Sequence, residues 1–166
     1  MPVGPATVLF LCTGNSARSI LAEAILNDPA IGGGRFRAVS AGSHPRGSVN
    51  PFALDILREV GLPTAGLRSK GWDEFGRPDA PPLDVVITMC DEAAGETCPI
   101  WPGHPATAHW GLPDPAAVEG DDEARRRAFR DAYAVIRRRI ARFAALPVDT
   151  LAPADLAGRL AEIGRA

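Results

Sequence analysis

Val8-Leu9-Phe10-Leu11-Cys12-Thr13-Gly14-Asn15-Ser16-Ala17-Arg18-Ser19 is the most informative stretch of the chain. Its first four residues form an apolar run that predicts a short buried strand. The polar residues 12–17 then predict a loop, and the apolar residues that follow, Ile20, Leu21, Ala24 and Ile25, keep helical spacing. The stretch therefore predicts a strand, a loop suited to an anion and the start of a helix, with a thiol at the entrance of the loop.

Each residue type in this loop has a chemical reason to bind an oxyanion. Gly14 is expected to allow a tight turn with a positive φ, and successive peptide N–H groups can then surround a tetrahedral anion. The start of the helix adds its positive dipole end, and the planar fork of Arg18 matches two oxygens. Asn15 is expected to brace the loop, and the Ser19 hydroxyl to donate to the Cys12 sulfur. The predicted oxyanion-binding residues are Thr13, Gly14, Asn15, Ser16, Ala17, Arg18 and Ser19.

These positive surroundings favour the thiolate form of Cys12, which predicts a nucleophile at neutral pH. The structural alternative makes Cys12 a small buried residue at a strand end and Arg18 a surface residue. The preceding strand, the Gly14-Asn15 pair and the following helix favour the anion loop. A Walker nucleotide loop is not predicted, because the pattern G-x-x-x-x-G-K-[ST] is absent.

The rest of the chain alternates apolar strands with amphipathic helices. Asn50 and Pro51 predict a helix start with an apolar face that includes Val60, and Gly61 predicts its end. The predicted strands cover 36–41, 83–88 and 107–110, the predicted helices cover 51–60, 121–146 and 150–164, and 76–82 is a predicted loop. This alternation predicts an α/β protein with a parallel sheet, whose ligands lie at the carboxyl ends of the strands.

Length and composition bound the other expectations. The 166 residues predict one domain over 1–166, with 147–166 as a terminal extension. A net charge of −2 does not indicate nucleic acid or membrane binding. Because there is no signal-peptide pattern and no apolar run of the ~20 residues that span a bilayer, we expect a cytoplasmic protein. Three cysteines in that compartment indicate free, catalytic or metal-binding thiols.

Four motifs together resemble a known family. The loop Cys12–Ser19 resembles the nucleophile loop of low-molecular-weight tyrosine phosphatases and of the arsenate reductases that share their fold. Three further stretches resemble the thioredoxin-coupled arsenate reductases: Ser40-Ala41-Gly42, Thr88-Met89-Cys90 through Cys98-Pro99, and His109-Trp110-Gly111-Leu112-Pro113-Asp114-Pro115. The resemblance covers residues 7–145 and implies a three-layer sandwich with a four-stranded parallel sheet, a monomer and no cofactor.

The resemblance also implies a reaction, the reduction of arsenate to arsenite. Cys12 would attack arsenic, Arg18 would hold the oxyanion, and Asp114 would be the general acid. Cys90 and then Cys98 would pass the oxidation on as disulfides, and thioredoxin or a glutaredoxin-type reductant would reset the enzyme. A turn aspartate is the structural alternative for Asp114, since two prolines flank it.

The spacing of the second and third cysteines raises a constraint. Cys90 follows the predicted strand 83–88, which places it at the same sheet edge as the anion loop. Eight helical residues rise about 12 Å, whereas a disulfide needs Cα atoms within about 7 Å. We therefore predict a redox-dependent rearrangement over 90–103. Two alternatives are inert buried cysteines and a zinc site of Cys90, Cys98, His104 and His109; that site lacks the usual close Cys pair, so no metal is predicted.

Other functions use fewer of these residues. A phosphatase needs Cys12, Arg18 and Asp114 but neither Cys90 nor Cys98. Against it, Ala17 stands where the phosphatases tend to carry a second loop cysteine, and Tyr133 is the only tyrosine. A module that senses oxyanions or metals without catalysis is the third candidate.

A lysine stands where some of these reductases bind potassium beside the loop. The matching positions include Asn15, Glu23 and Ser40, and Lys70 lies near the position where a carboxylate would be expected. Our hypothesis is that the Lys70 ammonium replaces the cation and pairs with Glu23; the alternative is a solvated surface lysine.

Overall fold

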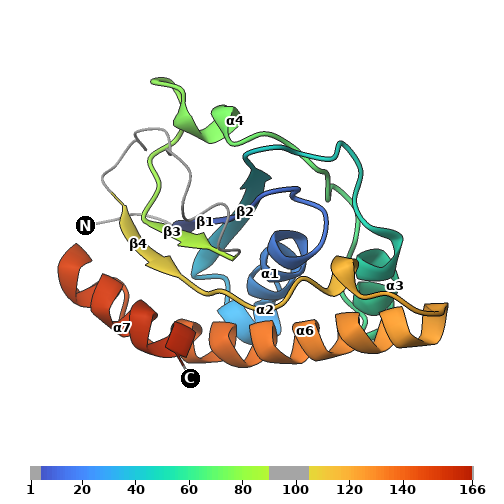
Figure 1. Ribbon diagram of the computed structural model, residues 1–166. Coiled ribbons are helices and arrows are strands. Elements are labelled where there is room, and N and C mark those ends of the chain that lie inside the picture. The colour runs from blue at the N-terminus through green and yellow to red at the C-terminus, as the bar shows by residue number, and fades with distance from the viewer. Residues whose placement is uncertain (1–4, 90–104, 166) are drawn as a thin grey trace.

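The computed structural model describes residues 5–89 and 105–165, so Cys90, Cys98 and His104 lie outside the described residues. Four parallel strands form one sheet in the order β2-β1-β3-β4 (Figure 1). They are β1 (Ala6–Cys12), β2 (Phe36–Gly42), β3 (Val85–Thr88) and β4 (Ala106–His109). The predicted α/β class, with its four-stranded parallel sheet, is confirmed.

The described helices lie mostly on one side of the sheet. In Figure 1, α1, α3 and the long α6 lie together, α7 continues past the end of α6 beside β4, and α4 lies on the opposite side. The helices are α1 (Arg18–Leu26), α2 (Pro29–Gly32), α3 (Pro51–Glu59), α4 (Asp73–Gly76), α6 (Asp122–Ala144) and α7 (Pro153–Arg165), with a 3-10 turn, η1, over Pro115–Ala117. None of the helices within residues 5–89 and 105–165 is long and apolar enough to cross a membrane.

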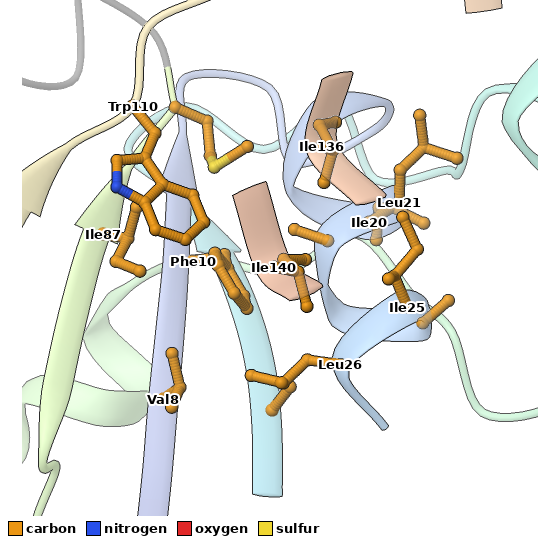
Figure 2. Packing of buried hydrophobic residues seen from close by; sticks show 14 of the residues in the cluster. Val8, Phe10, Ile20, Leu21, Ile25, Leu26, Ile87, Trp110, Ile136 and Ile140 are labelled. Carbon is orange, nitrogen blue, oxygen red and sulfur yellow. The ribbon is translucent and has the colours of Figure 1, made fainter. Parts of the chain in front are cut away.

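Alternate residues of β1 serve the two faces of the sheet. Val8 and Phe10 are fully buried against α1, α3, α6 and α7, as Figure 2 shows for the α1 and α6 side chains around them. Leu9 and Leu11 point the other way into a smaller cluster that Trp72 and Phe75 cover. Burial on both faces explains why β1 reads as a continuous apolar run.

The ends of α3 follow local sequence signals. The Asn50 side chain accepts a hydrogen bond from the Phe52 N–H, and Pro51 occupies the first turn. Gly61, with φ of 83°, follows the helix end. The prediction that Val60 belongs to the apolar face was wrong: Val60 is 42% exposed, because the helix ends at Glu59 and the backbone turns away from the core.

The C-terminal helix covers the edge strand of the sheet. Leu156, Leu160 and Ile163 of α7 are buried in the main core. The indole N–H of Trp110, the residue after β4, donates to the Leu160 carbonyl at 2.9 Å. Gly164 completes the fit, since a Cβ there would lie 2.7 Å from Trp110 Cδ1 and from the His109 carbonyl oxygen. The helix is therefore part of the packed core.

Candidate active site

A cavity of about 270 Å³ opens over the loop between β1 and α1. Because β1 pairs with β2 on one side and β3 on the other, the chain leaves its carboxyl end at the point where strand order reverses. The cavity is lined by Cys12, Thr13, Gly14, Ser16, Ala17, Arg18, His44, Arg46 and Asp114. The structure thus brings Arg18, Asp114 and most of the predicted loop residues to one place. Two predicted oxyanion-binding residues, Asn15 and Ser19, are fully buried and are not part of the lining.

The loop turns at Asn15. Asn15 has φ of 45°, and it is the only non-glycine residue with a positive φ among the described residues. The expectation that Gly14 supplies the positive φ was therefore wrong. Asparagine tolerates this region better than most residues, and here its side chain is held from three sides. Gly14 instead leaves room for the Arg46 side chain, which would lie 3.1 Å from a Cβ at that position.

The direction of the hydrogen bonds at Cys12 can be derived. Asn15 Oδ1 accepts from the Lys70 N–H at 2.9 Å, so its Nδ2 must face the hydroxyls of Ser19 and Ser40. Ser19 Oγ accepts that amide proton at 2.9 Å and lies 2.9 Å from Cys12 Sγ. Its own proton is therefore available to the sulfur. The Ser19 hydroxyl is thus placed to donate to the Cys12 sulfur.

The same network continues to a buried ion pair. Ser40 Oγ donates to Glu23 Oε1 at 2.7 Å, and Lys70 Nζ lies 3.6 Å from that oxygen. Lys70 Nζ also donates to the Arg68 carbonyl at 3.1 Å. Burial lowers the pKa of Lys70, while Glu23 opposes that shift. The Lys70–Glu23 pairing is thus present, and it closes a ring of polar contacts beneath the loop.

The first turn of α1 faces the cavity. Its N-cap residue, Ala17, has no side chain that can accept from the first N–H groups of the helix. Arg18 Nη1 donates to the Leu112 carbonyl at 3.1 Å, and its Nη2 lies 3.6 Å from Asp114 Oδ2. Uncapped N–H groups and an anchored guanidinium can together bind a tetrahedral oxyanion.

The Asp114 side chain caps the turn η1 and also lines the cavity. Its Oδ1 accepts from the Ala116 N–H at 3.0 Å, where it caps η1. Its other oxygen faces Arg18 and the cavity, and the side chain is 32% exposed. The two alternatives raised by the flanking prolines are therefore compatible, because one carboxyl oxygen serves each.

Three residues at or near the site were missed by sequence reasoning. His44 and Arg46 line the cavity from the segment after β2, and neither is among the predicted site residues. Arg139, on the long helix α6, is only 8% exposed. Its Nη1 donates to the carbonyls of Trp110 and Gly111, which lead into the Asp114 loop. Arginine is abundant in the chain, so Arg46 and Arg139 do not stand out, and no local pattern marks His44.

The relay and metal hypotheses fall largely on residues that are not described. Cys90, Cys98 and His104 lie there, so their distances to Cys12 and His109 stay predictions. His109 Nδ1 lies 2.7 Å from the Thr88 hydroxyl. Among residues 5–89 and 105–165, no group of three or more His, Cys, Asp or Glu side chains is placed to hold a metal.

The family model described as low molecular weight phosphotyrosine protein phosphatase matches residues 7–152. The chain belongs to this phosphatase family. The match ends just before α7, which begins at Pro153. The last helix therefore lies beyond the part that the family shares.

Arsenate reductases are among the proteins that this chain is similar to. The arsenate reductase of Bacillus licheniformis is 39% identical over 138 residues, which cover 83% of this chain and 94% of that protein. An arsenate reductase solved in the phosphate-binding state has a TM-score of 0.64 at 26% identity, covering 84% of this chain and 97% of its own. The thioredoxin-dependent arsenate reductase of Corynebacterium glutamicum has a TM-score of 0.56 at 30% identity, covering 82% of this chain and 61% of its own.

Proposed function

We propose that this protein is an arsenate reductase that converts arsenate to arsenite and is reset by thioredoxin or another thiol reductant. The observation that carries the proposal is the placement of Cys12, Arg18 and Asp114 on the wall of one cavity, in a chain 39% identical to an arsenate reductase. The thioredoxin-dependent relative of Corynebacterium glutamicum supports a thiol reductant.

The first step forms a bond between sulfur and arsenic. The Cys12 thiolate attacks the arsenic of bound arsenate while the loop N–H groups and Arg18 hold its oxygens. One oxygen leaves as water, and Asp114 supplies a proton to it. The position of Asp114 beside Arg18, on the lining of the same cavity, supports this role. Arsenic remains pentavalent in this adduct.

The second step transfers two electrons. The thiolate of Cys90 attacks the Cys12 sulfur, and the electron pair of the sulfur–arsenic bond passes to arsenic, which leaves as trivalent arsenite. Two thiols have then become a Cys12–Cys90 disulfide. Cys98 attacks Cys90, frees the Cys12 thiolate and leaves a Cys90–Cys98 disulfide. A dithiol reductant reduces that disulfide by exchange and is itself oxidised.

Arsenite release in a single turnover, without added reductant, tests the sequence of steps. Wild-type protein should release about one arsenite per chain, because its own thiols supply both electrons. Cys90→Ser should release almost none. Cys98→Ser should keep the first turnover and lose cycling with thioredoxin. The matched control is hydrolysis of an aryl phosphate, which needs neither of these two thiols.

The opposite pattern would favour a phosphatase. A wild-type protein that releases no arsenite and hydrolyses the aryl phosphate equally well with and without Cys90 and Cys98 contradicts the proposal. Stoichiometric arsenate binding with neither reaction would instead indicate a binding module.

A further inference from the structure

The cavity has a second wall, which we call the rim segment, residues 43–50. Two backbone hydrogen bonds join it to the anion loop. The His44 N–H donates to the Thr13 carbonyl at 2.9 Å, and the Arg46 N–H donates to the Gly14 carbonyl at 3.0 Å. A third runs from the Asn50 N–H to the Ser16 carbonyl at 2.9 Å. The rim segment therefore holds a fixed position relative to the groups that surround the anion.

Ser69 adds a side-chain bridge between the same two segments. Its Oγ donates to the Gly14 carbonyl at 3.1 Å and accepts from the Gly47 N–H at 3.1 Å. The backbone N–H of Arg46 is therefore bonded to the anion loop directly, and the N–H of the next residue, Gly47, is connected to the same loop through Ser69. A side chain carried between two such anchors is preorganised, which reduces the conformational entropy lost when it binds a ligand.

The Arg46 side chain lies over the anion loop. Its Cγ, Cδ and Nε atoms would lie 3.2, 3.4 and 3.1 Å from a Cβ at position 14. Only the absence of a side chain at Gly14 allows this approach. Arg46 lines the cavity together with Cys12 and Arg18.

The cavity wall carries two arginine charges, and only one of them has a nearby carboxylate within the described residues. Arg18 shares its charge with Asp114, whose carboxylate lies 3.6 Å away. The proposed reaction also uses Cys12 as a thiolate nucleophile, which adds a negative charge to the cavity. Within residues 5–89 and 105–165, no carboxylate pairs with Arg46. Arg46 is therefore a second cation on the described cavity wall, beside Arg18, and no described carboxylate offsets its charge toward an incoming anion.

We propose that Arg46 is a specificity-determining residue that gives the cavity its preference for doubly charged tetrahedral oxyanions over singly charged ones. The inference rests on the proposed function for the identity of the natural substrate, arsenate, and it names the ionic form that the site selects. Because Coulomb energy scales with the charge of the ligand, a cation at the cavity mouth strengthens binding of a dianion twice as much, in free energy, as binding of a monoanion.

Tungstate and perrhenate form a suitable pair of probes. Both are tetrahedral and isoelectronic, and they carry two charges and one charge respectively. Dissociation constants for each are measured by titration calorimetry with reduced wild-type protein and with Arg46→Met. Methionine keeps an apolar stem over Gly14 and removes the charge together with the guanidinium donors, and the two probes separate these effects because only the charge effect differs between them. We expect tungstate binding to weaken about tenfold and perrhenate binding about threefold.

Two further variants control the result. Arg46→Lys retains a charge without the planar fork, so tungstate binding should weaken by about threefold only. Arg37→Ala removes an equal charge from an exposed position of β2 that pairs with Thr7, at the far end of the strand from Cys12 and Gly42. Both affinities should stay within about twofold of wild type in Arg37→Ala, since salt screens distant charges.

The proposal is overturned if Arg46→Met leaves both affinities unchanged, or weakens both by the same factor. It is also overturned if Arg37→Ala reproduces the effect. Binding needs neither a reductant nor turnover, so the two proposals can fail separately. Charge-dependent tungstate binding in a protein that releases no arsenite would retain this inference and remove the proposed reaction.

Discussion

Lys70 Nζ lies 3.6 Å from Glu23 Oε1, and the two side chains are only 7% and 12% exposed. The backbone N–H of the same lysine holds Asn15, the residue at which the anion loop turns. One residue therefore fixes the loop through its backbone and neutralises the carboxylate beneath it through its side chain.

Lys70→Met should lower the free energy of unfolding by about 3 kcal/mol, because it leaves the Glu23 carboxylate buried without its partner. The double variant Lys70→Met/Glu23→Gln should lose less than Lys70→Met alone, since no uncompensated charge remains. Urea denaturation measures both. Equal losses in the two variants would show that the ion pair is not the cause.

If the Lys70 ammonium replaces a potassium ion, potassium should have no specific effect on the wild-type protein. Melting temperatures in potassium chloride and in sodium chloride of equal concentration should then agree. A marked stabilisation or activation by potassium alone would contradict the hypothesis.

Asp114→Asn should reduce the rate of arsenite release about a hundredfold, because an amide cannot protonate the departing oxygen. Its melting temperature should stay close to that of wild type, since the side-chain oxygen can still accept from the Ala116 N–H. Single-turnover kinetics and thermal denaturation provide the two readouts. A loss of rate matched by a large loss of stability would return Asp114 to a purely structural role.

Arg139→Met should lower kcat about tenfold with a smaller change in KM, because the carbonyls of Trp110 and Gly111 lose the donor that positions the Asp114 loop. Burial lowers the pKa of Arg139, and its Nε has no hydrogen-bond partner within the described parts of the chain. Removing this buried charge offsets the lost hydrogen bonds, so stability should change by only about 1 kcal/mol. The exposed neighbour provides the control: Arg138→Met should leave kcat unchanged.

Two glycines of α7 should respond in opposite directions to alanine. Gly164→Ala places a Cβ 2.7 Å from the His109 carbonyl oxygen and from Trp110 Cδ1, so we expect a loss of about 2 kcal/mol. A Cβ at Gly158 meets nothing within 4 Å. Gly158→Ala should therefore stabilise the protein by about 0.5–1 kcal/mol through helix propensity. Urea denaturation of both variants checks the contrast, and stabilisation by both would mean that α7 does not pack on Trp110 as described.

The Arg68–Glu74 pair should contribute to acid sensitivity. Arg68 donates to both Glu74 oxygens, at 2.8 and 2.7 Å, and these hydrogen bonds hold the pKa of Glu74 below 4.5. The unfolded chain therefore binds more protons than the folded chain as pH falls below 4.5, and the stability present above that pH is lost. Glu74→Gln should flatten this part of the stability profile. Arg68→Met should flatten it equally, and an unchanged slope in either variant would contradict the assignment.

Local sequence patterns predicted those helices, strands and loops whose determining residues all lie within one short segment. The apolar run before Cys12 and the helical spacing after it place the anion loop, and Asn50 with Pro51 starts α3. These features depend on neighbours within a few residues, which sequence periodicity and capping rules describe directly.

The remaining features depend on contacts between distant segments. Asn15 takes the left-handed conformation because Ser40 and Lys70, 25 and 55 residues away, hold its side chain. Arg139 is buried because carbonyls of another segment accept its protons, so helical polarity alone assigns it to solvent. Arg46 reaches the cavity only because the rim segment folds back on the loop. No local pattern contains that information.

The hydrogen bond from Trp110 to Leu160 gives the molecule a built-in spectroscopic reporter. The indole is fully buried and stands between the last helix and the segment that ends at Asp114. With Trp72 and Trp101 replaced by phenylalanine, the emission maximum would follow the polarity around a single fluorophore. Detachment of the helix would then appear as a red shift before global unfolding, in the same cuvette as an oxyanion titration.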